Sequence, residues 1–285
     1  MEKIKYLVIL IVLIALFSCQ KKNKPAVFRI GYSDYSFDIA VAYVLKGILD
    51  QQPNLNVELY KIPEDSVMFH ALLENELDIA ISVLLPLTHK DFMEKHAYEI
   101  LKFDSLCDSM GAYVTVPIYA DLEKVADLRN FSSQMKNTIL IPDGQNALYE
   151  FGKDVIKDYN LTNYQFTETS WDNIITYVED SLQESSNFAF IGMRPHWIYD
   201  KYDIKILEDS RHSLGIFESA HIICNVKFTE KMPTIAGFLR QVNFNLSDIE
   251  YLMELNQTLG SEPYENALKW INQNTFRINR WLIDH

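Results

Sequence analysis

Two short loops carry the residues of this chain whose types and spacing suit ligand binding. Leu84–His89 reads Leu-Leu-Pro-Leu-Thr-His, and Gly192–Trp197 reads Gly-Met-Arg-Pro-His-Trp. In each loop a histidine lies after a proline, and imidazole can bind a polar ligand or tie down its own loop. His196 is the stronger candidate and His89 the weaker one. Arg194 adds a planar fork of donors that fits a ligand carboxylate or phosphate, or else forms a salt bridge within the chain.

These residues match no catalytic or metal-binding motif. The sequence lacks the Gly-x-Ser-x-Gly, His-Glu-x-x-His and Cys-x-x-Cys patterns. A metal site built from His89, His196 and a carboxylate stays open as an alternative, although the spacing of the histidines is not diagnostic. We therefore expect a binding protein rather than an enzyme, without a cofactor or a bound metal.

Both loops follow apolar segments that read as buried strands, at residues 78–83 and at residues 188–191, where Gly192 ends the strand. Further strands and helices alternate with them along the chain, which predicts parallel sheets covered by helices. The other predicted strands are at residues 27–30, 57–60, 113–117, 138–141, 164–167 and 219–226. The predicted helices are at residues 38–52, 66–76 with Ser66 as N-cap, 146–159, 170–182 with Ser170 as N-cap, and 247–282.

The alternation occurs twice, and no Pro/Gly/Ser-rich linker separates the two occurrences. This predicts an α/β fold of two lobes that share crossing strands. We expect lobe 1 to comprise residues 27–110 plus 217–285, and lobe 2 to comprise residues 111–216. Ligands of open parallel sheets bind beyond the carboxyl ends of the strands, so the cleft between the lobes is the expected site.

The N-terminus indicates the compartment. An apolar run of twelve residues, Tyr6–Phe17, follows two lysines, and it is short for a membrane span, which needs about 18 residues. The motif Leu-Phe-Ser-Cys that ends at Cys19 resembles the bacterial lipobox. This resemblance implies that residues 1–18 are removed, that Cys19 is lipidated, and that residues 19–26 form a tether. An ordinary signal or short anchor with an incidental cysteine is the alternative. We expect an extracytoplasmic, membrane-anchored lipoprotein in the periplasm or at the cell surface.

The charge balance limits the partners. The chain has 26 Lys and Arg against 39 Asp and Glu, a net charge of −13. Such an acidic protein is a poor partner for nucleic acid or anionic lipid, so we expect membrane contact through the lipid anchor only. Beside Cys19 there are two cysteines, Cys107 and Cys224. An oxidising compartment permits a disulfide bond, but both lie in apolar runs, where buried free thiols are the expected outcome.

The two loops resemble those of the substrate-binding proteins of glycine betaine and choline-type ABC importers. Those proteins carry a Trp-Leu-Pro-x-Thr-His loop and a Gly-Trp-x-Pro-His-Trp loop that continues as Lys-Tyr-Asp-Leu-Lys-x-Leu-x-Asp. Here the continuation, Lys201–Asp209, reads Lys-Tyr-Asp-Ile-Lys-Ile-Leu-Glu-Asp. The resemblance covers roughly residues 27–282. It implies a two-lobed periplasmic-binding-protein fold, type II-like, that closes on a small zwitterionic solute and works with ABC permease subunits. A sensor built on the same fold is the alternative.

The chain departs from the family pattern at two positions. A quaternary ammonium donates no hydrogen bond and is held by the faces of aromatic rings, and in the family the tryptophans of the two loops contribute to that cage. Here Leu84 and Met193 occupy those positions. The ammonium site is therefore absent or rebuilt from other rings. The candidates for rebuilding, each with core or helix packing as the alternative, are Tyr32, Tyr35, Phe37 and Trp171.

A positive charge at Arg194 would repel a bare ammonium, while His196 could bind a carboxylate. We therefore expect glycine betaine or a related zwitterion as the ligand and disfavour choline, with an anionic or amino-acid-like ligand as the alternative. The expected ligand-binding residues are Tyr32, Tyr35, Leu84, Trp171, Met193, Arg194 and His196.

Overall fold

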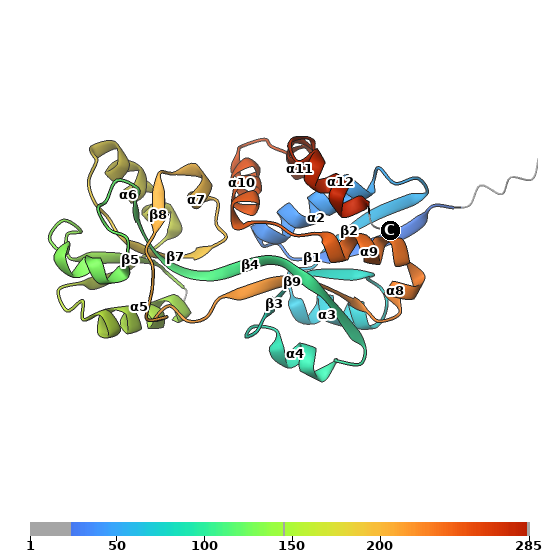
Figure 1. Cartoon of the computed structure of the whole chain (residues 1–285), viewed down its shortest axis with the longest axis horizontal. Helices are drawn as coiled ribbons and strands as arrows, with labels where there is room; N and C mark the ends of the chain where they lie inside the picture. Colours follow the sequence, from blue (N-terminus) through green and yellow to red (C-terminus); the bar gives the residue numbers. More distant parts are fainter. Residues whose placement is uncertain (1–23, 145, 284–285) are drawn as a thin grey trace, which may run out of the picture.

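One long strand connects two α/β lobes. The computed structural model describes residues 24–144 and 146–283, and in it β4 runs for 18 residues, Ile100–Pro117. Its first part pairs antiparallel with β9 (Glu218–Asn225), and its last part pairs with β7 (Phe190–Arg194) and β8 (Ile204–Ile206). The strand order is β2-β1-β3-β9-β4-β7-β5-β6, with β8 beside β4. Figure 1 shows β4 extending between the lobes, so the predicted two-lobed α/β fold is what the structure contains.

Lobe 1 holds the N-terminal strands and the C-terminal helices. Strands β1 (Ala26–Tyr32), β2 (Leu55–Lys61) and β3 (Ile79–Leu85) are parallel, as the alternation predicts. The helices of this lobe are α2 (Ser36–Leu49), α3 (Asp65–Leu73), α4 (Lys90–Lys95), α8 (Phe228–Lys231), α9 (Pro233–Gln241), α10 (Leu246–Gln257), α11 (Pro263–Gln273) and α12 (Thr275–Leu282).

Helix α2 lies between the sheet and α11, and for this reason it is buried on most sides. The C-terminal helices complete the core around two tryptophans. The rings of Trp270 and Trp281 stack with their centroids 6.3 Å apart, and both are buried. This confirms the packed face that the sequence predicts for the tail.

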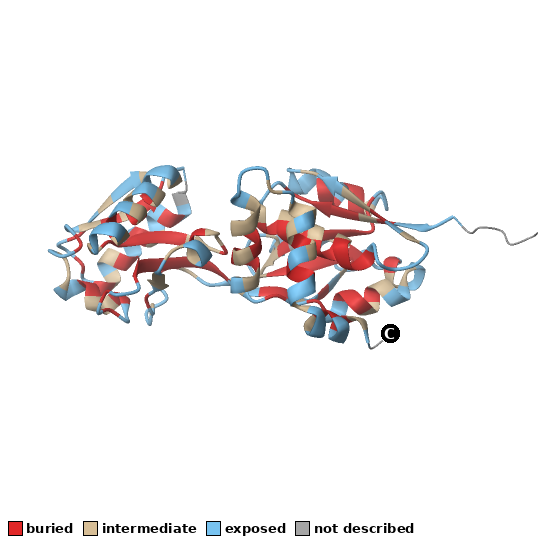
Figure 2. Cartoon of the chain, turned by 90° about the horizontal axis from the view of Figure 1, so that it is seen from above, coloured by how far each residue is buried: buried red, intermediate tan, exposed pale blue. Residues whose placement is uncertain are grey.

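Lobe 2 is a second parallel unit. Strands β5 (Thr138–Pro142) and β6 (Gln165–Thr169) run parallel to each other, and β5 also runs parallel to β7. The helices of this lobe are η1 (Val125–Asn130), α5 (Asn146–Tyr159), α6 (Trp171–Glu184) and α7 (Ile198–Lys201). Figure 2 shows the buried segments gathered into separate interiors, one in each lobe, which agrees with the distinct hydrophobic clusters of the two halves.

The structure corrects three details of the predicted elements. Ser66 is not an N-cap, because α3 already begins at Asp65. Strand β7 does not end at Gly192 but continues to Arg194, because it pairs with β4 as far as that residue. The predicted single tail helix is three helices, with Pro263 at the start of α11. The cap at Ser170 is confirmed, since its hydroxyl accepts a hydrogen bond from the Asn173 amide at 3.3 Å.

The two internal cysteines are buried free thiols. Cys224 lies on β9 opposite Leu101, whereas Cys107 lies on β4 opposite Ala220, which comes four residues before Cys224 on β9. Burial raises the pKa of each thiol to about 12, so both stay protonated. The expectation of free thiols rather than a bridge is therefore confirmed.

The predicted signal segment, residues 1–18, and Cys19 lie outside the described residues. Between Lys24 and Ile283, leaving aside residue 145, no helix is long and apolar enough to cross a membrane.

Candidate ligand-binding site

A cavity of about 530 Å³ lies where the two lobes meet. Leu84, near the end of β3, and Met193, near the end of β7, both line it, so the cavity lies at the carboxyl ends of strands from both lobes. Tyr35 contributes from the start of α2, and Leu148 and Phe151 contribute from α5. Its walls are therefore mostly aliphatic, with two aromatic rings among the residues that line it.

The structure brings four of the seven predicted residues together around this cavity, namely Tyr35, Leu84, Met193 and Arg194. The other three do not line it. Tyr32 is buried in the core of lobe 1, where its ring packs edge-on against Tyr43 at 6.4 Å. Phe37, the further aromatic candidate, is also fully buried in that core. Core packing, the alternative that the sequence left open, therefore describes Tyr32 and Phe37.

Trp171 and His196 form a pair of their own. Their rings stack at a centroid distance of 4.3 Å with an interplanar angle of 13°. The imidazole Nδ1 accepts a hydrogen bond from the Ile198 amide at 3.3 Å. Burial lowers the pKa of His196 to about 4, so the ring is neutral at pH 7. It supports the loop after β7 as an uncharged ring rather than as a cation.

His89 fixes the loop after β3. Its Nδ1 accepts a hydrogen bond from the Leu84 amide at 2.8 Å, and its Nε2 lies 3.0 Å from an oxygen of Asp65. The same loop is held from β9, because the carboxylate of Glu218 accepts hydrogen bonds from the amide and the hydroxyl of Thr88, both at 2.7 Å. Glu218 lines the cavity with its charge already hydrogen-bonded. This role of Glu218 could not be recognised from the sequence, because Thr88 lies 130 residues away.

Arg194 is paired across the lobes. Its Nε and Nη2 donate to the two carboxylate oxygens of Glu250 at 2.7 and 2.5 Å. Glu250 lies on α10 of lobe 1 and is 2% exposed. The guanidinium also lies 4.8 Å from the ring centroid of Tyr199. Burial raises the pKa of Glu250, and the two hydrogen bonds from Arg194 offset part of that rise.

This ion pair corrects one expectation about the site. The positive charge expected beside the pocket is compensated by Glu250, which occupies both prongs of the Arg194 fork. The salt bridge is the alternative that the sequence left open, although it crosses between the lobes instead of lying on a rim. A second cross-lobe bond lies next to it, since the Tyr35 hydroxyl donates to the carbonyl of Pro195 at 3.3 Å. The sequence could not identify Glu250 as the partner of Arg194, because the two residues are 56 positions apart.

The alternative of a metal site at His89 and His196 is not supported in the part of the chain that the structure describes. Within those residues, no group of three or more His, Cys, Asp or Glu side chains is placed to hold a metal ion. His89 is instead engaged with the Leu84 amide and with Asp65.

Two α/β lobes that share crossing strands, with a cavity between them, define the two-lobed fold of periplasmic binding proteins. The chain belongs to the family described as the substrate-binding domain of ABC-type glycine betaine transport systems, whose sequence pattern matches residues 27–273. This membership confirms the resemblance seen in the two loops and places the chain among binding domains rather than enzymes.

Individual relatives agree with this assignment. The glycine betaine/carnitine transport binding protein GbuC of Listeria monocytogenes is 26% identical over 156 residues, which are 54% of this chain and 51% of that protein. The chain thus matches about half the length of that curated relative. Lactococcal OpuAC, in a closed form with glycine betaine, superposes with a TM-score of 0.64 at 21% identity, over 90% of this chain and 99% of that one. ProX of Borrelia burgdorferi gives a TM-score of 0.62 at 20% identity, over 91% and 97%. The structural likenesses support the two-lobed fold.

The Arg194–Glu250 pair yields a prediction about stability. Replacing one partner, in Arg194→Met or Glu250→Leu, leaves the other buried charge without its counterion and should lower the free energy of unfolding by about 3–5 kcal/mol. The double variant should recover most of this loss. Urea denaturation measures the effect, with Glu150→Leu as the control because the Glu150–Lys153 pair is exposed and its loss should leave the stability nearly unchanged. Single variants as stable as the wild type would contradict a buried, mutually dependent pair.

Proposed function

We propose that the chain is the extracytoplasmic solute-binding subunit of an ABC importer and that it binds glycine betaine or a related small zwitterion by closure of its lobes. The observation that supports this most strongly is the cavity of about 530 Å³ that both lobes line at the ends of β3 and β7, in a chain of the glycine betaine family. The carnitine and glycine betaine named for the relatives are ligands of the same chemical class.

We further propose how the seven predicted residues act. Tyr35, Leu84 and Met193 contact the ligand directly, since they line the cavity. Arg194 takes part as a neutral pair with Glu250, because its fork is already occupied. Tyr32 supports the wall of lobe 1 from its core. Trp171 and His196, which stack on each other outside the cavity, approach the ligand when the lobes close.

The expected preference for a zwitterion over choline now rests on the carboxylate of the ligand alone and no longer on repulsion by Arg194. Arg194 no longer repels an ammonium group, because Glu250 compensates its charge. Choline remains disfavoured because it lacks a carboxylate for the His196 ring, whose Nδ1 accepts from the Ile198 amide and whose other nitrogen can therefore donate to the ligand on closure. The absence of two tryptophan faces weakens all quaternary ammonium ligands, since each cation–π contact contributes roughly 0.5–2 kcal/mol. Only Tyr35 and Phe151 offer rings among the residues that line the cavity.

The chain divides naturally for such a closure. We propose that lobe 1 comprises residues 27–110 plus 217–285 and that lobe 2 comprises residues 111–216. This division is supported by the two main hydrophobic clusters, one of which runs from Phe28 to Met110 and from Ala220 to Trp281, while the other runs from Ala112 to Leu214.

Ligand preference is tested by calorimetry. The wild type should bind glycine betaine in preference to choline, and restoring the two rings in Leu84→Trp/Met193→Trp should tighten glycine betaine binding by one to three factors of ten, as two added cation–π contacts require (roughly 0.5–2 kcal/mol each). Val67→Trp, at a half-exposed position of α3 outside the cavity, is the control and should change nothing. Tight choline binding by the wild type, together with no gain for glycine betaine in the double variant, would overturn this view of the pocket.

Membrane attachment is a separate part of the proposal. We propose that residues 1–18 are a lipoprotein signal, that Cys19 carries the lipid, and that residues 19–26 tether the body. Cys19→Ala should then release the protein from membranes or leave it as an uncleaved precursor, whereas Cys107→Ala, a change at a buried free thiol, should leave it attached. Membrane fractionation and mass spectrometry distinguish these results. An unmodified Cys19, with no change in fractionation on mutation, would exclude the lipid anchor.

A further inference from the structure

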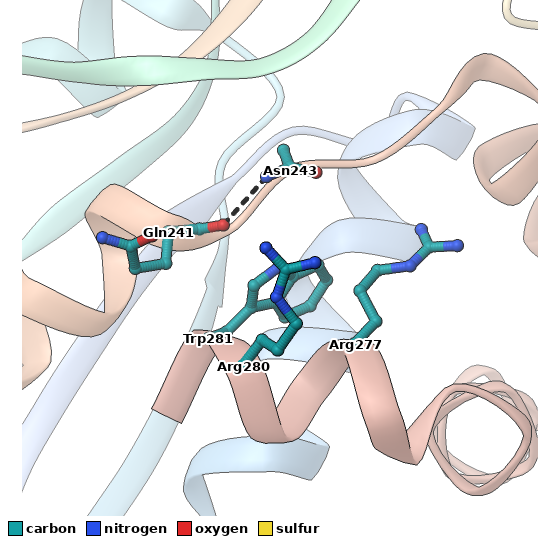
Figure 3. A pocket seen from close by; sticks show the side chains of 5 residues that line it. All are labelled: Gln241, Asn243, Arg277, Arg280 and Trp281. Atoms are coloured by element: carbon teal, nitrogen blue, oxygen red, sulfur yellow. Dashed lines mark hydrogen bonds between the residues drawn. The ribbon is translucent and has the colours of Figure 1, made fainter. Parts of the chain in front are cut away.

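A second cavity, polar and smaller, lies against α12 outside the ligand site. It has a volume of about 210 Å³ and is lined by Gln241, Asn243, Arg277, Arg280 and Trp281. Figure 3 shows the two arginine side chains projecting from α12, near Gln241 at the end of α9 and Asn243 just after it. The Asn243 side chain donates to the Gln241 carbonyl at 3.0 Å and so fixes the opposite wall. The cavity thus presents two guanidinium groups in a protein with a net charge of −13.

The two arginines differ in their partners. Arg277 forms an ion pair with Asp248 and lies 5.5 Å from the centroid of the Trp270 ring, so its position is fixed. Arg280 is exposed, and its guanidinium forms neither a hydrogen bond nor an ion pair within residues 24–144 and 146–283. Its planar fork of donors is therefore available to a group with two acceptor oxygens, such as a phosphate.

Apolar side chains flank Arg280 along the same helix face. Phe276 lies four residues before it and is 79% exposed, and Ile283 lies three residues after it and is 71% exposed. Residues at these spacings occupy one face of a helix. An exposed ring and an exposed aliphatic side chain on either side of an arginine suit the boundary between lipid headgroups and acyl chains, where basic amphipathic helices bind.

Helix α12 lies at the end of lobe 1 where the chain enters. The Ala26 amide, at the start of β1, donates to the Asn54 carbonyl at 2.8 Å. Asn54 and Leu282 line a common cavity, which places the end of α12 beside the beginning of the sheet. Figure 1 shows the first described residues at this outer end of lobe 1, away from lobe 2. Since Cys19 and Ala26 are separated by at most about 25 Å of extended chain, a lipid on Cys19 holds this end close to the bilayer.

We propose that α12 is a membrane-docking surface, in which Arg280 binds the phosphate of an anionic phospholipid headgroup beside Arg277 while Phe276 and Ile283 enter the interface. This proposal rests on the lipidation of Cys19 proposed above. The net charge of the body opposes adsorption from solution, so the anchor must first supply a high local concentration. Docking then orients lobe 1 on the bilayer and leaves lobe 2 free to close over the ligand.

Hydrogen exchange of the lipidated full-length protein tests the proposal. The protein is reconstituted in vesicles of phosphatidylcholine alone or of equal parts phosphatidylcholine and phosphatidylglycerol. Amides of residues 275–282 should exchange about fivefold more slowly on the anionic vesicles, the factor that corresponds to ~1 kcal/mol for one basic side chain at an anionic surface. Arg280→Gln should abolish the difference. Lys269→Gln removes an exposed positive charge from the neighbouring α11 and should preserve it.

Two further measurements distinguish a missing lipid anchor from a missing docking surface. Flotation with neutral vesicles reports the anchor, so a protein that does not float overturns both the lipidation of Cys19 and the docking that depends on it. A protein that floats but shows equal exchange on both vesicles overturns the docking site alone. Inorganic phosphate added to neutral vesicles distinguishes the source of the phosphate. If inorganic phosphate slows amide exchange in residues 275–282 on neutral vesicles by the same factor, the site binds free phosphate, and this result would contradict binding of a lipid headgroup.

Discussion

The architecture depends on the change of partner in the middle of β4. This strand pairs with β9 of lobe 1 as far as Met110 and with β7 of lobe 2 from Gly111 onward. Phe217 lies so close to the crossing point that a Cβ on Gly111 would come within 2.6 Å of its ring, so a larger residue would displace the ring. Because Met110 and Gly111 also line the ligand cavity, the junction of the lobes and the candidate site are formed by the same short stretch of backbone.

Polar contacts across the junction connect lobe 1 to lobe 2. Arg194 and Glu250 form a buried bidentate pair, and Tyr35 bonds to the carbonyl of Pro195 beside it. Removing two charges from water offsets much of their mutual attraction, so such a pair contributes little net stability. Its directional geometry instead defines how the lobes meet. Met193, the neighbour of Arg194 on β7, lines the cavity beside this pair.

The sequence predicted what local pattern and loop chemistry can show. The spacing of apolar residues and the helix-capping residues predicted most of the helices and strands. The substitutions at Leu84 and Met193 were visible because the residues around them in the two loops match the family motif. The first half of β4 was missed because register shifts around Ser105 and Cys107 interrupt its alternation. Glu250 could not be assigned to Arg194, because long-range pairing between a helix and a strand leaves no periodic trace in either segment.

We propose that the two lobes close on a small zwitterion held between them. Small-angle X-ray scattering, recorded with and without saturating glycine betaine, tests it most directly. Hinge closure about β4 and β9 should reduce the radius of gyration when the ligand is bound. Saturation confirmed by calorimetry with an unchanged radius of gyration would show binding without closure and contradict the account.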